Sequence, residues 1–416
     1  MSPVRPTVQL IGRRLDPDHH RMRDLLTRAA QPHDWLEAGS PEAEALLAER
    51  GLTDPPLPVL VDGAEVHEGI TPERLGVAWK MSAPPSREHY DFAVIGAGPA
   101  GLAAAVYAAS DGLSTVVFER DLPGGQASHT SMIENFFGFP EGIGGAELAR
   151  LAGRQAEGFG AELVLMRGVV GGGPDDGRSR FEIDGGYTIT AEVGLAAPGI
   201  EWRRLEVEGV DELIGRGVYY GAGRSEAAQC GGDHVIVIGA GNSAGQAVMN
   251  LANAGANVKM LVRGDRLAKT MSAYLVERIE RHPLIDVRLG TEVESLETDA
   301  DGCLAAVGVT GGERLPAIAL FICIGGVPRT GWAAPIGVRT DRVGYILTGP
   351  DLLEGGSRPG GWPLDRDPLA LETSVPGLFA AGDVRHGSTK RVAGAVGEGA
   401  MAVALAHRRL EELAGR

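Results

Sequence analysis

Two glycine-rich turns constrain the fold of this chain more than any other feature. GAGPAG at 96–101 and GAGNSA at 239–244 each follow an apolar run of strand character and open a helical run. Each helical run is followed by a second strand pattern, STVVFER after the first and NVKMLVR after the second. A strand, a turn, a helix and a further strand form a βαβ unit with parallel strands. The chain is therefore predicted to be an α/β protein that contains two such units.

The first turn has the pattern of a dinucleotide-binding loop. Gly96 permits the tight turn, Gly98 lets the backbone approach a pyrophosphate, and Gly101 allows the helix to pack closely on the strand. The phosphates then face the amides and the positive end of the helix dipole. Glu119 ends the next strand, where a carboxylate can accept hydrogen bonds from ribose hydroxyls.

The second turn favours NADPH over NADH as its nucleotide. Its next strand ends in Arg263 rather than in an acidic residue. An arginine suits a 2′-phosphate by charge and by bidentate geometry, whereas a carboxylate would repel that group. The alternative is that Arg263 is a solvated loop residue, in which case NADH remains open.

A flavin is indicated near the C-terminus. The strand in LFAAGDV ends at Gly382-Asp383, and the helical run GAVGEGAMAVALAHRRL follows it. An aspartate at this place can bind a ribityl hydroxyl, and the helix N-terminus can stabilise negative charge on a reduced ring. The alternative is that Asp383 merely caps a helix.

Length and charge narrow the class of partner. A chain of 416 residues is long enough for two or three domains. Its net charge of −16, from 55 acidic and 39 basic residues, argues against nucleic acid or an anionic membrane as the main partner. The N-terminus has no signal-peptide pattern, and no apolar run approaches the roughly 20 residues that span a bilayer. We therefore expect a cytoplasmic protein.

The three cysteines have neither metal-binding nor redox spacing. Cys303 and Cys323 fall in or beside predicted strands and are expected in the core. Cys230 lies beside two glycines ahead of a strand, and we expect a free surface thiol rather than a catalytic one. The acidic and histidine residues at 16–20 are expected to begin a helix in solvent, and no metal site is predicted.

Residues 88–416 resemble the low-molecular-weight thioredoxin reductase family. The matching pieces are, in order, VIGAGPAGLAAAVYAA, GGQASHTSMIENFFGFPEGIGGAEL, GRGVYY, VIGAGNSAG, LFAAGDV and KRVAGAVGEGA. The resemblance implies two Rossmann-like, three-layer domains, one for FAD and one for NAD(P), and a homodimer. It implies FAD contacts from Gly96, Gly98, Pro99, Ala100, Gly101, Glu119, Gly125, Gln126, Asn135, Gly382, Asp383, Arg391, Val392 and Ala393. It implies pyridine-nucleotide contacts from Gly239, Gly241, Asn242, Ser243, Ala244 and Arg263.

Residues 1–81 resemble a glutaredoxin and so predict a thioredoxin-fold domain without cysteines. The family's Cys-Pro-x-Cys falls on DPDH at 16–19, GlnPro at 31–32 matches its mid-domain Val-Pro, and Leu57-Pro58 occupies the place of its cis-proline. The predicted organisation is this domain, a linker, the first part of the FAD domain, an inserted NAD(P) domain and the second part of the FAD domain. The boundaries are 1–81, 82–89, 90–200, 201–325 and 326–416.

The chain departs from the reductase family at several functional positions. The family's Cys-Ala-x-Cys-Asp falls on 221–225, which reads GAGRS, and Glu226 would supply the acid only after a shift of one residue. Its His-Arg-Arg-Asp for NADPH keeps one arginine, and its Arg-Gln-Ala near the flavin reads RVA at 391–393. The segment 348–374 looks longer than the family's equivalent and is expected to be a surface loop.

The absent thiols determine the function expected from the sequence. Disulfide reduction needs a thiolate that attacks and a second thiol that resolves the mixed disulfide. We therefore expect an FAD-dependent NAD(P)H oxidoreductase that passes electrons directly to a non-disulfide acceptor, whether a small molecule, a quinone, dioxygen or a redox protein. Arg224 and Glu226 are the candidate catalytic residues, although Arg224 also suits a surface salt bridge.

Three alternatives remain open at this point. The first is a non-catalytic FAD-binding protein with an interaction or regulatory role. The second is an FAD-dependent oxidase of a small metabolite. The third keeps disulfide chemistry through Cys230 and a thiol of a partner. The N-terminal segment is expected to serve docking or dimer contacts, because it has no redox group of its own.

Overall fold

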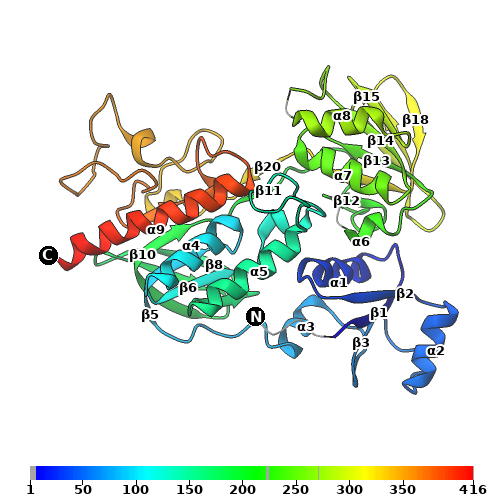
Figure 1. Cartoon of the computed structure of the whole chain (residues 1–416), viewed down its shortest axis with the longest axis horizontal. Coiled ribbons are helices and arrows are strands. Elements are labelled where there is room, and N and C mark those ends of the chain that lie inside the picture. Colours follow the sequence, from blue (N-terminus) through cyan, green and yellow to red (C-terminus); the bar gives the residue numbers. More distant parts are fainter. Residues whose placement is uncertain (1–5, 222–223, 270, 416) are drawn as a thin grey trace.

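The chain forms three units that pack against one another (Figure 1). The computed structural model describes residues 6–221, 224–269 and 271–415. We call the units the N-terminal unit (residues 6–81), the central unit (the seven-stranded sheet with its helices) and the distal unit (the five-stranded sheet with its helices).

The N-terminal unit is a four-stranded sheet in the order β2-β1-β3-β4, with helices on it. Strand β1 pairs in parallel with β2 and antiparallel with β3. Helix α1 presents Met22, Leu25 and Leu26 to the core beneath it, because they lie on one face at helical spacing. The Leu57–Pro58 peptide bond is cis. The elements are β1 Val8–Gly12, α1 Pro17–Arg28, β2 His33–Glu37, α2 Pro41–Glu49, β3 Val59–Asp62, β4 Glu65–His67 and α3 Pro72–Ala78.

The central unit is built on the first βαβ pattern. Its sheet has the order β7-β6-β5-β10-β9-β8, and β21 from the C-terminal part of the chain pairs in parallel with β10. Strands β5, β6, β7 and the end of β10 run in parallel. The elements are β5 His89–Ile95, α4 Pro99–Ser110, β6 Thr115–Glu119, η1 Gly125–His129, α5 Gly145–Gly158, β7 Glu162–Leu165, β8 Val169–Asp175, β9 Arg178–Ile183, β10 Tyr187–Ala196, β21 Leu378–Ala380, η4 Gly382–Val384 and α9 Val392–Ala414.

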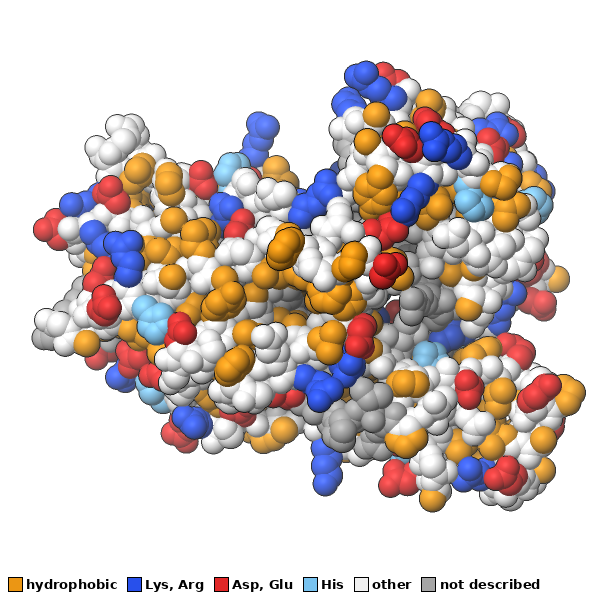
Figure 2. Space-filling model, viewed as in Figure 1, with side chains coloured by type: hydrophobic (Ala, Val, Ile, Leu, Met, Phe, Trp, Pro, Cys, Tyr) orange, Lys and Arg blue, Asp and Glu red, His pale blue; other side chains and the backbone are white. Residues whose placement is uncertain are grey.

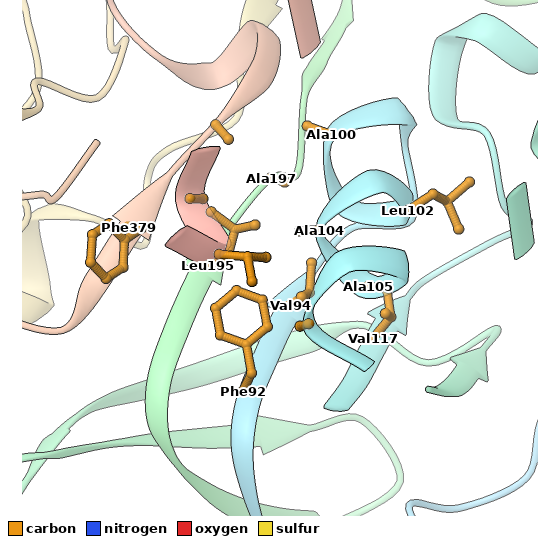
Figure 3. Close-up of a cluster of buried hydrophobic side chains, with 14 of the residues drawn as sticks. Phe92, Val94, Ala100, Leu102, Ala104, Ala105, Val117, Leu195, Ala197 and Phe379 are labelled. Carbon is orange, nitrogen blue, oxygen red and sulfur yellow. The ribbon is translucent and has the colours of Figure 1, made fainter. Parts of the chain in front are cut away.

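Helix α4 lies in the core of the central unit, between the sheet and helix α9. Most residues of α4 are small and apolar, so the helix can pack closely against its neighbours. Figure 3 shows several of them in one cluster with Phe92, Leu195 and Phe379 of the sheet. A side chain at Gly399 of α9 would overlap the carbonyl oxygen of Ala100. Glycine at 399 therefore allows the two helices to approach closely enough to bury α4.

The distal unit is built on the second βαβ pattern. Its parallel sheet has the order β12-β19-β13-β14-β15, and an antiparallel sheet β16-β17-β18 accompanies it. The elements are β12 Val218–Tyr220, α6 Arg224–Ala227, β13 His234–Ile238, α7 Asn242–Asn253, β14 Asn257–Val262, α8 Ala273–Arg281, β15 Ile285–Leu289, β16 Val293–Thr298, β17 Leu304–Val309, β18 Glu313–Pro316 and β19 Ala319–Ile322.

Two short strands join the central and distal units. β11 (Ile200–Trp202) leaves the central unit, β20 (Gly326–Pro328) returns to it, and the two pair antiparallel. Arg329 forms an ion pair with Glu201 beside this pair of strands. The backbone connection between the two large units is therefore narrow.

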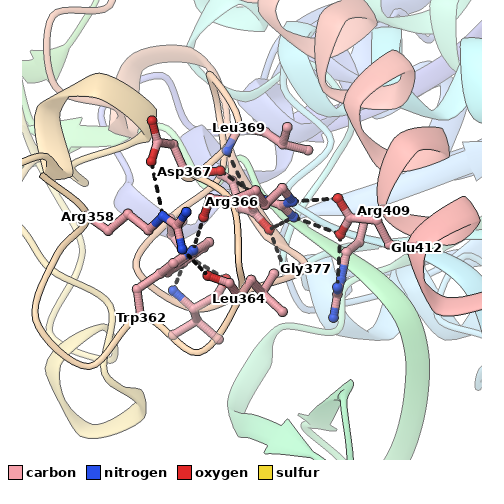
Figure 4. Close-up of polar contacts among 12 residues, drawn as sticks. Arg358, Trp362, Leu364, Arg366, Asp367, Leu369, Gly377, Arg409 and Glu412 are labelled. Carbon is pink, nitrogen blue, oxygen red and sulfur yellow. Dashed lines mark hydrogen bonds and ion pairs between the residues drawn. The ribbon is translucent and has the colours of Figure 1, made fainter. Parts of the chain in front are cut away.

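The segment 348–374 follows β20 without any β-strand, as a surface loop was expected to do. It contains the short helix η3 Gly349–Leu352, and a second short helix, η2 Ala334–Ile336, precedes it. Arg366 ties this segment to helix α9 through Glu412, and to the buried carboxylate of Glu372 (Figure 4). Charged side chains hold the loop in one place against the central unit.

Several sequence expectations can be compared with these units. The α/β prediction with two βαβ units is confirmed, and Cys303 and Cys323 are buried as expected. The expectation that Cys230 is a surface thiol is wrong, because its side chain packs in the apolar core of the distal unit. Asp16 begins α1 as expected, since its carboxylate accepts hydrogen bonds from the backbone amides of Asp18 and His19 at 3.0 and 3.2 Å. The expected solvation of this helix start is wrong in part, because His19 is 5% exposed.

The surface mixes charged and apolar side chains (Figure 2). On the face drawn in Figure 2, acidic and basic side chains are interspersed. Within the described part of the chain, no helix is both long and apolar enough to cross a membrane.

Candidate functional site

A cavity of about 400 Å³ lies where the three units meet. Most of its wall comes from the loops that follow the carboxyl ends of β5, β6, β10 and β21 in the central unit. In open α/β sheets this edge is where ligands bind. The distal unit adds the N-terminal end of α7, and the N-terminal unit adds Arg28.

The first glycine turn forms one end of the cavity. Gly96 has a φ of +97° that favours glycine, and a side chain there would overlap the carbonyl oxygen of Ala197. Gly98 is the N-cap of α4 and makes no side-chain cap, and nothing lies within 4 Å of where its Cβ would be. The first amides of α4 therefore face open space, which fits a bound pyrophosphate. Pro99 and Ala100 also line the cavity, whereas Gly101 lies behind it against the sheet.

Glu119 lies at the end of β6, on the cavity wall. Its carboxylate accepts hydrogen bonds from the backbone amides of Ala97 at 2.8 Å and Asp121 at 3.0 Å. Burial raises the pKa of Glu119. The carboxylate thus fixes the glycine turn and the following loop to each other, and its remaining lone pairs are free for a ribose hydroxyl.

Three predicted contacts from the segment around η1 line the cavity: Gly125, Gln126 and Asn135. The side-chain amide of Gln126 donates a hydrogen bond to the carbonyl oxygen of Ile200 at 2.7 Å. Since Ile200 begins β11, this bond holds η1 beside the connection to the distal unit.

The C-terminal part of the wall carries charge of both signs. Gly382, Asp383, Arg391 and Val392 line the cavity, whereas Ala393 does not. Burial raises the pKa of Asp383. Lys390, which the sequence analysis missed, donates to the backbone oxygen of Asp383 and lies over the ring of Tyr345 at 4.2 Å. A lysine beside the helix α9 N-terminus adds positive charge where a reduced ring would carry negative charge.

The second glycine turn brings the distal unit to the same cavity. Gly239 has a φ of +132°, and a side chain there would overlap the carbonyl oxygen of Cys323. Gly241 is the N-cap of α7 without a side-chain cap, and the space around it is open. Asn242 and Ser243 line the cavity. Both turns therefore direct uncapped helix amides toward one space, which fits two nucleotides that must meet.

Four predicted nucleotide contacts lie outside the cavity wall: Gly239, Gly241, Ala244 and Arg263. Ala244 is buried in the distal core. Arg263 follows β14 and is exposed, as either of its two interpretations requires. A nucleotide that runs from the cavity across α7 to the end of β14 would pass these residues on its way.

Of the two candidate catalytic residues, only Glu226 has a described side chain, and it does not line the cavity. Of Arg224 only the backbone, in α6, lies in the described part of the structure, and residues 222–223 lie outside it. Glu226 is 6% exposed and faces His20 of α1, with 3.5 Å between Oε1 and Nδ1. Gly221 does line the cavity, beside Trp202 and His129.

Sequence reasoning missed the contribution of the N-terminal unit and of the segment after η1. Arg28 belongs to no recognisable motif and lies far from both glycine turns in the sequence, so no local signal marks it. Apart from Lys390, the missed lining residues are Arg28, Arg120, Asp121, Leu122, Ala127, His129, Thr130, Ser131, Ile133, Ala197, Pro198, Gly199, Ile200, Glu201, Trp202, Gly221, Gln246, Ala247, Cys323, Ala381 and Ala395.

His129 is strongly affected by this environment. Burial, with the Arg28 guanidinium nearby, lowers the pKa of His129 to about 4. Its Nδ1 lies 3.7 Å from Asp24 Oδ1, and its ring meets that of Trp202 edge-on, with 6.1 Å between centroids. The imidazole is therefore neutral at pH 7.

His129→Gln is expected to reduce the loss of stability in mild acid. Between pH 6.5 and pH 4 the unfolded chain binds a proton on His129 that the folded chain does not, so the free energy of unfolding falls as pH falls. The loss is at most about 3 kcal/mol. Urea unfolding of both proteins at pH 7 and pH 5 measures the part of this loss that falls in that interval, about 2 kcal/mol. Burial raises the pKa of Asp24, so protonation of Asp24 stabilises the folded chain as pH falls. Asp24 is present in both proteins, so this contribution cancels in the comparison. Equal pH dependence in the two proteins would contradict the prediction.

The described residues contain no group of three or more His, Cys, Asp or Glu side chains that could hold a metal ion. The three cysteines are buried and unpaired with one another. Burial raises the pKa of Cys230 to about 11 and that of Cys323 to about 12. None of these thiols is poised as a nucleophile at neutral pH.

Comparison with known proteins places the chain among flavin-dependent reductases. Residues 90–399 match the family described as pyridine nucleotide-disulphide oxidoreductase. Thioredoxin reductase of Treponema pallidum is 34% identical over 322 residues, which are 75% of this chain and 94% of the relative. Thioredoxin reductase of Listeria monocytogenes is 33% identical over 336 residues, 78% of this chain and 95% of the relative.

A solved structure shows the same likeness. Lactococcus lactis thioredoxin reductase, in the form named the FR conformation, superposes with a TM-score of 0.68 at 29% identity, and covers 78% of this chain and 99% of its own. The fold is thus a mixed α/β fold of thioredoxin reductase type with Rossmann-like units. The first 89 residues lie outside the matched family region.

These comparisons correct the function expected from the sequence. We expected electrons to pass to a non-disulfide acceptor, with a non-catalytic flavin protein or a metabolite oxidase as alternatives. The relatives that match most of the chain are thioredoxin reductases, which are disulfide reductases. The expected small-molecule acceptor is wrong for the same reason, because such reductases act on thioredoxin, a protein.

The cavity and the comparisons agree on the cofactors. Two uncapped helix ends face one space, and the family to which the relatives belong uses FAD and NADPH. The chain is an FAD-dependent oxidoreductase with NADPH as its nucleotide, and it belongs to the pyridine nucleotide-disulphide oxidoreductase family.

Proposed function

We propose that this chain is an NADPH-dependent flavoprotein reductase of a disulfide carried by a protein partner. The observation that carries the proposal is the single cavity reached by both glycine turns. When bound, FAD supplies two-electron transfer between NADPH and the acceptor. In the overall reaction NADPH, a proton and one disulfide become NADP⁺ and two thiols.

The partner supplies both sulfur atoms in this proposal. The sequence has three cysteines and no Cys-x-x-C, so the chain is not a disulfide reductase by its own cysteines. Cys323 lies on the cavity wall, but its pKa of about 12 leaves it protonated. Cys230 is buried in the distal core, which disfavours the alternative of a mixed disulfide with a partner. No thiol of this chain would therefore act as an intermediary between the cofactors and the partner's disulfide.

Two groups of residues hold the nucleotides in this proposal. The α4 amides bind the FAD pyrophosphate, Glu119 binds the ribose, and Asp383 binds the ribityl chain. Asn242 and Ser243 hold the nicotinamide nucleotide at the α7 end. The remaining FAD contacts are Gly125, Gln126, Asn135, Gly382, Arg391, Val392 and Ala393, and Arg263 binds the 2′-phosphate.

The N-terminal unit is proposed to be a thioredoxin-fold domain of glutaredoxin type. Its support is the strand order β2-β1-β3-β4, with one parallel and two antiparallel pairings and with α1 following β1. The proposed domains are 1–81, 90–200 with 326–416, and 201–325, with 82–89 as linker. A homodimer stays a prediction from the resemblance, and a cytoplasmic location stays a prediction from the sequence.

An anaerobic titration with NADPH tests the proposed function. The flavin absorbance of the wild-type protein is expected to bleach within seconds, and oxidised thioredoxin is expected to restore it. Gly239→Val is the matched variant, because it moves the second turn and leaves the first intact. We expect it to retain FAD and to slow bleaching by about 100-fold. If oxidised thioredoxin reoxidises the reduced protein no faster than buffer does, the proposed acceptor is wrong.

A further inference from the structure

Helix α1 of the N-terminal unit lies in the junction between the central and distal units (Figure 1). We propose that α1 is a positioning element that holds the two large units in the orientation in which both glycine turns share one cavity. The inference rests on the proposed function for the identity of the two nucleotides. It adds a role for a unit that has no redox group and lies outside the matched family region.

Arg28, in the last turn of α1, is the contact with the central unit. Its Nη2 donates to Asp121 Oδ2 at 2.7 Å and its Nε donates to Ser128 Oγ at 3.3 Å. Ser128 in turn donates to the carbonyl oxygen of Gly125 at 2.7 Å. Arg28 therefore ties together the loop after β6 and the start of η1, which are two walls of the cavity.

The same guanidinium is held from its own helix. Nη1 of Arg28 donates to Asp24 Oδ2 at 3.3 Å, and the Arg28 side chain is 11% exposed. Its two carboxylate neighbours raise the pKa of Arg28 despite burial. A buried cation with three fixed partners specifies one geometry, because any displacement leaves charges unpaired.

The start and middle of α1 contact the distal unit. Besides its contact with Glu226, His20 packs its ring against that of Tyr219, with 4.8 Å between centroids. Arg23 is 1% exposed, and with the Gln229 amide turned toward it, two of its nitrogens donate to Gln229 Oε1 at 3.1 Å. Glu226 also compensates the buried charge of Arg23. α1 is thus fixed to β12 and α6 by buried polar contacts.

A further polar contact joins the N-terminal unit to the distal unit. Arg14, ahead of α1, donates to Asp233 Oδ2 at 3.3 Å, just before β13. A side chain at Gly215 would lie only 2.7 Å from the Cα of Pro17, so the two backbones are in close contact there. The distal unit is therefore held along a line of contacts from Arg14 to Arg23, while Arg28 holds the central unit.

The narrow connection between the central and distal units explains why a positioning element is needed. β11 and β20 are three residues each, so on their own they leave the distal unit free to turn. The distal unit carries no dithiol that must reach the flavin. One fixed orientation then serves the whole reductive half of the reaction, and α1 supplies it.

Cross-linking tests the inference without any turnover. Arg14→Cys with Asp233→Cys replaces two half-exposed side chains whose charged ends touch, so a short bis-maleimide should join the N-terminal and distal units. The two single variants are the controls. Adding His20→Ala and Arg23→Ala is expected to slow cross-linking at least tenfold. Adding Arg21→Ala, a change at an exposed arginine on the same helix, is expected to leave it unchanged.

Stopped-flow reduction by NADPH supplies the second readout. The cross-linked protein is expected to reduce its flavin at the rate of the uncross-linked protein, because the fixed orientation is the active one. His20→Ala/Arg23→Ala, and Glu226→Gln from the distal side, are expected to lower the rate at saturating NADPH at least tenfold, with FAD content unchanged.

The outcomes separate this inference from the proposed function. A cross-linked protein that no longer reduces its flavin, or variants that cross-link and reduce at the wild-type rate, would overturn the positioning role. A wild-type protein that NADPH does not reduce would instead contradict the proposed function. In that case the cross-linking rates still decide whether α1 fixes the two units.

Discussion

Gly101→Ala is expected to destabilise the central unit and to release FAD. A Cβ at this position would overlap the carbonyl oxygen of Gly96 and lie 3.1 Å from Val94 Cγ1. The obstructing atom is backbone, so α4 must move away from β5. Overpacking of a close-packed core typically costs about 1 to 3 kcal/mol, and a backbone clash places this variant at the upper end. The same movement displaces the α4 amides from the cavity.

Urea unfolding and flavin fluorescence measure the two effects of Gly101→Ala separately. Gly98→Ala is the matched control, because nothing lies within 4 Å of its Cβ position and its φ of −70° suits alanine. We expect Gly98→Ala to keep its stability within about 0.5 kcal/mol while its methyl group weakens FAD binding at the α4 end. A Gly101→Ala protein that binds one FAD per chain with wild-type stability would show that α4 packs less tightly on β5 than the structure has it.

These glycine positions show how much of the fold the sequence specifies. GAGPAG and GAGNSA report backbone geometry directly, because only glycine fits the turns and the close helix–strand contact. The two βαβ units and their order followed from such local patterns, whereas the chain's return to the central sheet was implied only by the family resemblance. Burial of Cys230 did not, since the two glycines beside it read as surface loop, whereas the structure packs the thiol into the distal core.

The cavity could be predicted only where one segment supplies a recognisable pattern. The α4 and α7 turns, Glu119 and Asp383 each follow a strand, and strand ends of a parallel sheet meet at one edge. Arg28 and His129 carry no such mark. Arg28 and His129 come together because α1 packs against the central unit. The contact joins segments about 100 residues apart in the sequence, as the hydrogen bond from Arg28 to Ser128 shows. A tertiary contact of this kind leaves no periodicity in either segment.

The functional error has a chemical cause. The missing dithiols show that this chain does not itself carry the redox-active disulfide. They do not show that the electron acceptor is something other than a disulfide. The relatives, which match most of the chain, are disulfide reductases, so they contradict the expected non-disulfide acceptor. They leave unchanged the conclusion that this chain has no dithiol of its own. The disulfide that a reductase reduces can belong to a partner protein as well as to its own polypeptide.

Glu372→Ala is expected to destabilise the central unit by about 3 to 5 kcal/mol, because it leaves two buried backbone amides without an acceptor and Arg366 with one carboxylate partner instead of two. Glu372 is fully buried, and its two oxygens accept from Arg366 Nη1 at 2.6 Å and Nη2 at 3.1 Å. They also accept from the backbone amides of Leu369 at 2.9 Å and Gly377 at 3.0 Å. Figure 4 labels Arg366, Leu369 and Gly377 of this network, together with Glu412 near the end of α9.

Glu372→Ala is expected to loosen the segment around residue 372 before it unfolds the whole central unit. Arg366 keeps Glu412 in the variant, so α9 retains one contact, whereas the amides of Leu369 and Gly377 lose their acceptor inside the protein. Hydrogen exchange is expected to rise first at 366–378, and urea unfolding to shift to lower concentration. Glu354→Ala is the control, since its ion pair with Arg339 is exposed and contributes about 0 to 1 kcal/mol. Equal shifts for the two variants would mean that solvent reaches Glu372, and that the segment is held to the central unit by its apolar contacts alone.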